Sequence, residues 1–229
     1  MPTSRGYGSP QGTAQPRDTV VDGHSALQSD PPSTPPQHCS AVLCLVSVGR
    51  VIPALLIIDM QAALAPGLWR GEELTDRIAL LAERARDRGT PVVALQQTGP
   101  AETPFDPDDP GWQLNPRLHL REEDLRVRKS ATDSFFRTDL AEVLAARHVD
   151  TVVITGAATD YCVDATARSA LSLGFNVVLV EDAHAPVIDS DTRLTAEQIV
   201  AHHSEILSQA IHPGGTLRVV AAADVFAGS

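Results

Sequence analysis

Lysine is almost absent from this sequence of 229 residues, in which Lys129 stands beside 17 arginines. The 18 basic residues face 29 acidic ones, so the formal net charge at pH 7 is -11. Affinity for nucleic acids depends largely on lysine and arginine neutralising phosphates, and the sequence contains no basic tract. We therefore expect no nucleic-acid partner, and the single lysine requires its own explanation.

Cysteines and long apolar runs are also scarce. Cys39, Cys44 and Cys162 are too few for a disulfide framework in a chain of this length, which favours a reducing, cytoplasmic setting. No run reaches the roughly 20 apolar residues of a membrane-spanning helix, so we expect no membrane association. A glycine-rich nucleotide fingerprint and a serine nucleophile elbow are both missing, which excludes two common kinds of enzyme site.

The composition divides the chain into two parts. The first 38 residues contain 7 of the 17 prolines and show neither helical nor strand periodicity. Such a segment buries too little apolar surface to offset its ordering entropy, so residues 1–50 are predicted to form a disordered tail. Residues 51–229 carry the surplus negative charge and are predicted to form one domain.

Short apolar runs alternate with amphipathic segments throughout that domain. The run at residues 54–58 is continuously apolar, as in a strand buried on both faces, and the stripe at residues 72–88 indicates a helix ended by Gly89. This alternation predicts a three-layer α/β fold with a mostly parallel, Rossmann-like sheet and helices on both faces. Further strands are expected at residues 92–96, 125–128, 151–155, 176–180 and 217–221, and further helices at 138–147, 162–173 and 195–210. A long loop is expected at residues 98–118.

Three chemically distinctive residues follow strands of this sheet. Asp59 follows the first strand, Lys129 the third and Cys162 the fourth, and ligands of such sheets bind beyond the carboxyl ends of the strands. We therefore expect these three side chains to form one site. His184 is expected to be a loop residue on the same edge, after the strand at residues 176–180, with contact to the substrate as the alternative.

Cys162 has two interpretations from its local sequence. A small-residue turn leads into a predicted helix, and a thiol at a helix N-terminus is expected to have a lowered pKa and thiolate character. Backbone amides there could also stabilise an oxyanion during acyl transfer. The alternative is a buried cysteine that packs as a small hydrophobe.

Lys129 and Asp59 also have non-catalytic interpretations. Lys129 could be a solvated surface charge, and Asp59 could be a helix cap or a turn residue. Lysine differs from arginine because burial can shift its pKa, so a site that tunes a proton favours lysine. A partly desolvated carboxylate can take a thiol proton and later return it to a leaving amine. The three residue types together suit amide hydrolysis through a thioester.

Three segments resemble the signature blocks of the isochorismatase-like cysteine hydrolases. They are residues 56–61 (LIIDMQ), 128–140 (RKSATDSFFRTDL) and 155–163 (TGAATDYCV). That family includes nicotinamidases, N-carbamoylsarcosine amidases, ureidoacrylate amidohydrolases and streptothricin hydrolases. The resemblance extends from residue 54 to about residue 221 and implies no cofactor.

The resemblance implies a role for each of the three residues. Cys162 would be the nucleophile, Asp59 the general acid/base and Lys129 the cation that supports the thiolate and orients Asp59. It also implies a cis peptide bond between Ala157 and Ala158, with the amides of Ala158 and Cys162 directed at the oxyanion. The expected substrate is a small amide, ureide or lactam, cleaved at a C–N bond without a metal.

Two departures from the family pattern concern the substrate. Metal-dependent nicotinamidases carry an Asp-x-His pair after the second strand, where this sequence reads LQQT at residues 95–98. Leu64 replaces the aromatic residue that often stacks on nicotinamide. We expect Leu64, Gln97, Phe135 and Tyr161 to line the pocket, with a place in the core as the alternative for Phe135 and for its neighbour Phe136.

Several functional alternatives stay open at this point. A nicotinamidase-like amidase is one, and a non-catalytic binding module with an unreactive cysteine is another. The acidic domain would attract cationic substrates such as an aminated antibiotic, which would fit antibiotic resistance, although many cytoplasmic proteins are simply acidic. We also expect the domain to form a homo-oligomer.

Overall fold

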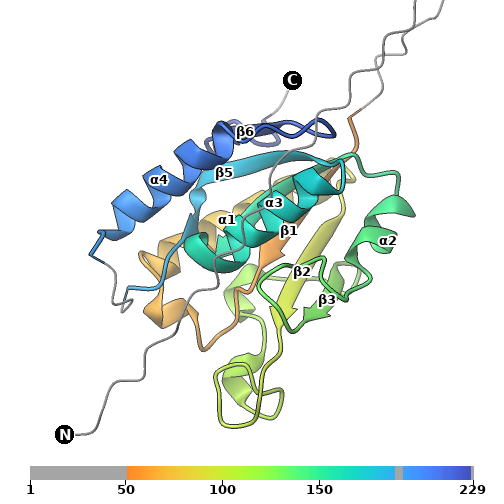
Figure 1. Cartoon of the computed structure of the whole chain (residues 1–229). Helices are drawn as coiled ribbons and strands as arrows, with labels where there is room; N and C mark the ends of the chain where they lie inside the picture. The colour runs from red at the N-terminus through yellow and green to blue at the C-terminus, as the bar shows by residue number, and fades with distance from the viewer. Residues whose placement is uncertain (1–50, 189–192, 228–229) are drawn as a thin grey trace, which may run out of the picture. The chain divides into compact units, whose positions relative to one another are not determined.

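The computed structural model describes residues 51–188 and 193–227. Six parallel strands in this part of the chain form one sheet in the order β3-β2-β1-β4-β5-β6 (Figure 1). The expected α/β fold with a parallel sheet is therefore confirmed. The strands are β1 (Pro53–Ile58), β2 (Val92–Gln97), β3 (Leu125–Lys129), β4 (Thr151–Ala157), β5 (Asn176–Ala185) and β6 (Leu217–Val220).

Helices cover both faces of the sheet and produce three layers. The helices are α1 (Gly71–Asp87), α2 (Leu140–Ala145), α3 (Asp164–Ser172) and α4 (Ala196–Ser208). The apolar stripe of α1 packs in one core cluster, whereas buried side chains of α2, α3 and α4 belong to a second cluster. No helix in the described part of the chain combines the length and apolar character needed to cross a membrane.

The central strand β1 contributes to both cores. Leu55 and Ile57 belong to the cluster that contains α1, and Leu56 and Ile58 belong to the opposite cluster. All four side chains are fully buried, which explains why the sequence of β1 is continuously apolar rather than alternating.

The sheet reverses its direction of growth between β1 and β4. These strands pair side by side, while β2 and β3 extend the sheet one way and β5 and β6 the other. Crevices form at the carboxyl ends of strands at such a switch point, and ligands bind there in open α/β sheets. The segments after β1 and β4 are therefore placed to form a site.

Several predicted boundaries need correction. Strand β5 continues to Ala185 instead of ending at residue 180, because an irregularity in its pairing with β4 lets the ladder resume at His184. Exposed Glu181 and Asp182 interrupt its apolar pattern, which hid the extension. Helix α2 is shorter than the predicted 138–147, and the predicted helix at 162–173 begins instead with a π-helical turn at Thr159–Val163. The predicted tail, residues 1–50, lies outside the described residues.

The contact of β4 with β1 generates a prediction about stability. Gly156 has φ +114, and a Cβ added there would lie 2.1 Å from the carbonyl oxygen of Ile58. We expect Gly156→Ala to lower the free energy of unfolding by about 3 kcal/mol or more, measured by urea denaturation. Gly67→Ala is the matched control, because no heavy atom lies within 4 Å of its added Cβ. Equal unfolding midpoints for the two variants would contradict this account.

Candidate active site

Asp59 lies directly beyond β1, at the switch point of the sheet. Asp59 is 2% exposed. Its φ of 51° places the backbone in the left-handed region, which aspartate tolerates better than most residues. The Asp59 N–H donates to the carbonyl of Leu95 on β2 at 3.1 Å. Backbone hydrogen bonding thus holds this carboxylate at the carboxyl edge of the sheet.

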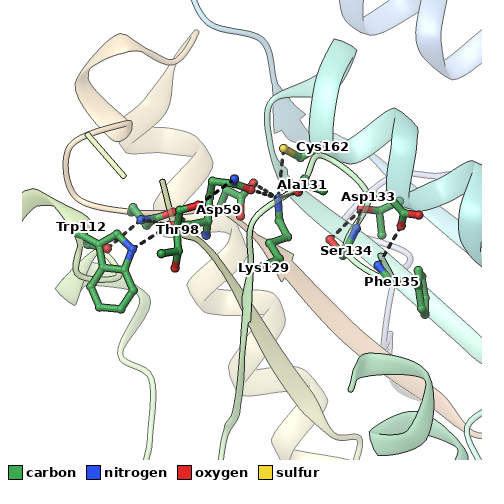
Figure 2. Close-up of polar contacts among 12 residues, drawn as sticks. Asp59, Thr98, Trp112, Lys129, Ala131, Asp133, Ser134, Phe135 and Cys162 are labelled. Carbon is green, nitrogen blue, oxygen red and sulfur yellow. Dashed lines mark hydrogen bonds and ion pairs between the residues drawn. The ribbon is translucent and has the colours of Figure 1, made fainter. Parts of the chain in front are cut away.

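Lys129 ends β3 and extends its side chain past the end of β2. Its Nζ atom lies 2.7 Å from Asp59 Oδ2 and 3.3 Å from Cys162 Sγ (Figure 2). Nζ also donates to Gln97 Oε1 at 2.7 Å and to the Ala131 carbonyl at 3.0 Å. The Lys129 side chain is 0% exposed, so these acceptors replace the water that a buried ammonium loses.

Gln97 is itself fixed by a second glutamine. The Gln97 N–H donates to Gln61 Oε1 at 3.0 Å, and Gln61 Nε2 donates to the carbonyls of Gln97 and Trp112 at 3.1 and 2.9 Å. Gln61 is fully buried and ties the segment after β1 to the end of β2. Sequence reasoning quoted Gln61 within a motif but gave it no role; its place three residues after a buried strand was the available signal.

Cys162 lies in the π-helical turn between β4 and α3. The turn spans Thr159–Val163, and the peptide bond between Ala157 and Ala158 is cis, as the resemblance implied. The Tyr161 and Val163 N–H groups both donate to the Ala158 carbonyl at 3.1 Å. Cys162 therefore lies in the first turn of a continuous helical segment, because the π-helical turn runs directly into α3, and its position agrees with the helix start that the sequence predicted.

The expected low pKa of Cys162 is corrected by the structure. Burial raises the pKa of the thiol to about 12, and the negative charge of Asp59 adds to this, while Lys129 opposes the shift. Burial also raises the pKa of Asp59, against the opposing effects of Lys129 and the Cys162 thiol. Asp59 Oδ1 is buried without a hydrogen-bond partner among the described residues. The resting pair is thus a protonated thiol beside a carboxylate with raised proton affinity.

A cavity of about 260 Å³ opens onto Asp59 and Cys162. It is lined by Leu64, Gln97 and Tyr161, as the sequence predicted, and by Ala158 next to the cis bond. Sequence reasoning missed lining residues from four other positions, which are Leu68, Phe105, Thr132 and Val187. One of them, Thr132, lies in the quoted block 128–140 but was given no role, and the other three are single side chains outside any motif.

Phe135 is not among the residues that line this cavity, contrary to the expectation that it lines the pocket. Its ring stacks on Phe175 with a centroid distance of 5.7 Å, and it packs against the core cluster that contains α3. Figure 2 shows Phe135 beyond Asp133 and Ser134, away from Lys129. The alternative of a core position is therefore the correct one.

His184 is a buried strand residue rather than the expected loop residue. It is 2% exposed, and burial lowers its pKa to about 4. Its Nδ1 atom lies 2.9 Å from Thr159 Oγ1, in the turn that carries Cys162. His184 faces Gly156 in the ladder between β4 and β5 and is absent from the cavity lining.

Metal ligands are a separate question. Groups of three or more His, Cys, Asp and Glu side chains that could hold a metal ion do not occur within residues 51–188 and 193–227. The acceptors nearest Lys129 are already engaged with its ammonium group. Independence from metals stays a prediction from the sequence.

The three-layer fold, with buried Asp59 and Lys129 beside the partly buried Cys162, is the arrangement expected of an isochorismatase-like hydrolase. Residues 53–210 match the model of the isochorismatase domain, and the chain belongs to this family of hydrolases. A crystal structure of an isochorismatase-type protein from Burkholderia xenovorans LB400 aligns with a TM-score of 0.69 and 31% identity, covering 77% of this chain and 86% of that one.

Two curated relatives have named activities. A streptothricin hydrolase of Streptomyces noursei is 38% identical over 140 residues, covering 59% of this chain and 55% of that protein. A nicotinamidase of Saccharomyces cerevisiae is 33% identical over 78 residues, covering 33% and 36%. The matched region thus spans about half the length of the streptothricin hydrolase.

The charge of Asp59 leads to a prediction about thiol reactivity. Because Asp59 raises the pKa of Cys162, Asp59→Asn is expected to lower that pKa and to speed alkylation of Cys162 by iodoacetamide at pH 7–8 by about tenfold. Peptide mass spectrometry would follow Cys162 separately from Cys39 and Cys44. Slower alkylation of Cys162 in the variant would contradict the assigned electrostatics.

Proposed function

We propose that the protein is a cysteine-dependent hydrolase that cleaves a C–N bond in a small amide, ureide or lactam. The observation that carries the proposal is the position of Lys129 Nζ, 2.7 Å from Asp59 Oδ2 and 3.3 Å from Cys162 Sγ, beside a cavity. A nucleophile, a proton acceptor and a cation at one cavity suit acyl transfer. The likeness to a streptothricin hydrolase supports this reaction class.

In the proposed reaction, the Cys162 thiol transfers its proton to Asp59 as sulfur attacks the substrate carbonyl. The Lys129 ammonium stabilises the thiolate that forms during this step, because it is already in contact with sulfur. Backbone amides of Ala158 and Cys162, both at the cavity, would bind the oxyanion. Collapse of this intermediate forms a thioester and expels ammonia or an amine, which takes the proton from Asp59.

The second half of the reaction returns the enzyme to its starting state. Asp59 accepts a proton from water, and the resulting hydroxide equivalent attacks the thioester. The acid product leaves as Asp59 returns that proton to the sulfur of Cys162. Asp59 thus acts as base and then as acid in each half of the reaction. The raised pKa of Asp59 serves this alternation, since a carboxyl group with ordinary acidity would hold a transferred proton only briefly.

The test is hydrolysis of a panel of primary amides, ureides and lactams by the full chain, followed by ammonia or amine release. Cys162→Ala is expected to reduce kcat/KM by about a thousandfold or more, because the thioester can no longer form. Far-ultraviolet circular dichroism of both proteins controls for folding. Mass spectrometry of the wild type mixed rapidly with substrate should show an acyl adduct on the peptide that contains Cys162.

Two results would overturn the proposal. Equal rates for wild type and Cys162→Ala would show that the thiol is not the nucleophile. Binding of amides by the wild type without turnover of any panel member would favour a binding module on the same fold.

A further inference from the structure

The chemical character of the cavity wall limits the substrate. Six of its lining side chains are apolar, and they come from the last residue of β4 and from the segments after β1, β2, β4 and β5. These residues are Leu64, Leu68, Phe105, Ala157, Ala158 and Val187. Asp59 is the one charged residue among the described lining residues, and its carboxylate is paired with Lys129.

Uncommitted polar groups at the cavity are also few. Gln97 already accepts a hydrogen bond from Lys129 through Oε1 and donates to the Thr98 carbonyl through Nε2 at 3.3 Å. Thr132 and Tyr161 supply the remaining side-chain hydroxyls, and both residues are exposed at the cavity. An ionic group bound next to Leu64 and Phe105 would lose water without gaining a counter-charge from the described wall.

We propose that the acyl group of the substrate is small, uncharged and predominantly apolar, which deepens the proposed function and rests on it. A volume of about 260 Å³ suits a compact group, because small-molecule sites usually measure about 300–1,000 Å³. The net charge of -11 draws cations toward the surface, but the carboxylate that lines the cavity, that of Asp59, is already paired with Lys129. The apolar wall of the cavity, rather than the net charge of the protein, therefore determines which acyl groups are preferred.

An isosteric pair of primary amides tests the proposal. 3,3-Dimethylbutanamide and trimethylammonioacetamide have the same shape and differ by one positive charge. We expect kcat/KM of the wild type to be about a hundredfold higher for the neutral amide, because the cation is desolvated without compensation. 3-Methylbutanamide and malonamate form the corresponding neutral and anionic pair, with the same expected direction.

Substitution of residues in the cavity wall should change the ratio of kcat/KM between the neutral and the cationic amide. Leu64→Glu is expected to raise the relative kcat/KM of the cationic amide about tenfold or more, and Phe105→Glu serves as a second variant if the first folds poorly. Leu80→Glu is the matched control, because Leu80 is 47% exposed on α1 and outside the cavity. It should leave the ratio unchanged.

The outcomes separate this proposal from the proposed function. Cys162-dependent hydrolysis that is equal or faster for an ionic amide would overturn the apolar preference and leave the hydrolase intact. Absence of hydrolysis for every amide would overturn both. Calorimetry of the same pairs with Cys162→Ala gives the preference without turnover, and tighter binding of an ionic member would also overturn it.

A second inference concerns a different contact, behind the turn that carries Cys162. Thr159 follows the cis-linked Ala158, is fully buried and places Oγ1 2.9 Å from His184 Nδ1. We infer that His184 is a positioning residue that holds this turn through Thr159. Its neutral imidazole suits the role. Burial lowers the pKa of His184 to about 4, so this ring stays uncharged near neutral pH.

Paired substitutions of Thr159 distinguish positioning from packing. Thr159→Val keeps the volume and removes the hydroxyl, whereas Thr159→Ser keeps the hydroxyl and removes a methyl group. We expect Thr159→Val to lower kcat about tenfold with KM changed by less than about twofold, and Thr159→Ser to retain most of kcat. His184→Asn, which can replace the Nδ1 contact, should exceed His184→Ala in kcat. A Thr159→Ser variant as impaired as Thr159→Val would overturn the inference.

Discussion

The ion pair between the Lys129 ammonium and the Asp59 carboxylate is the constraint on which the site depends. Both side chains are excluded from water, and the two atoms in contact are 2.7 Å apart. Loss of one partner from such a pair typically costs about 3–5 kcal/mol, because the other charge stays buried without compensation. The ends of β1 and β3 must therefore keep their relative positions, and the thiol of Cys162 is held against the same ammonium.

The order of strands explains how residues far apart in sequence reach one point. Strands β1 and β4 are neighbours at the switch point, so the segments that carry Asp59 and Cys162 begin side by side at the edge of the sheet. Strand β3 is separated from β1 by β2, and the long side chain of Lys129 crosses that distance. Gln97 at the end of β2 accepts one of its hydrogen bonds and so fills the position between them.

Much of this arrangement could be predicted from the sequence, for reasons that are physical. The apolar run of β1 and the amphipathic stripe of α1 are periodic signals that burial imposes over many residues. Asp59, Lys129 and Cys162 each follow a predicted strand, so strand order alone placed them on one edge. The local reading of Cys162 gave the wrong direction for its pKa, because burial and the charge of Asp59 are long-range effects.

Other features depend on contacts that leave no local pattern. Phe135 stacks on Phe175, 40 positions later in the chain, and nothing in the sequence near Phe135 distinguishes this from a place in the cavity. His184 seemed to lie in a loop because Glu181 and Asp182 interrupt the apolar pattern of β5. Phe105 and Val187 reach the cavity through the path of loops, which hydrophobic periodicity does not encode.

The reactive residues lie at strand ends and most cavity-lining residues lie on loops, which affects how the substrate range of such a protein can change in evolution. The reactive residues are tied to strand ends by buried hydrogen bonds and an ion pair, whereas Leu64, Phe105 and Val187 are half-buried residues outside helices and strands. The side chains of these wall residues take no part in the ladders of the sheet or in the ion pair, although Val187 also packs against the core cluster that contains α1. Descendants of this chain could therefore acquire new substrates by neutral drift in three loops while the reaction stays the same.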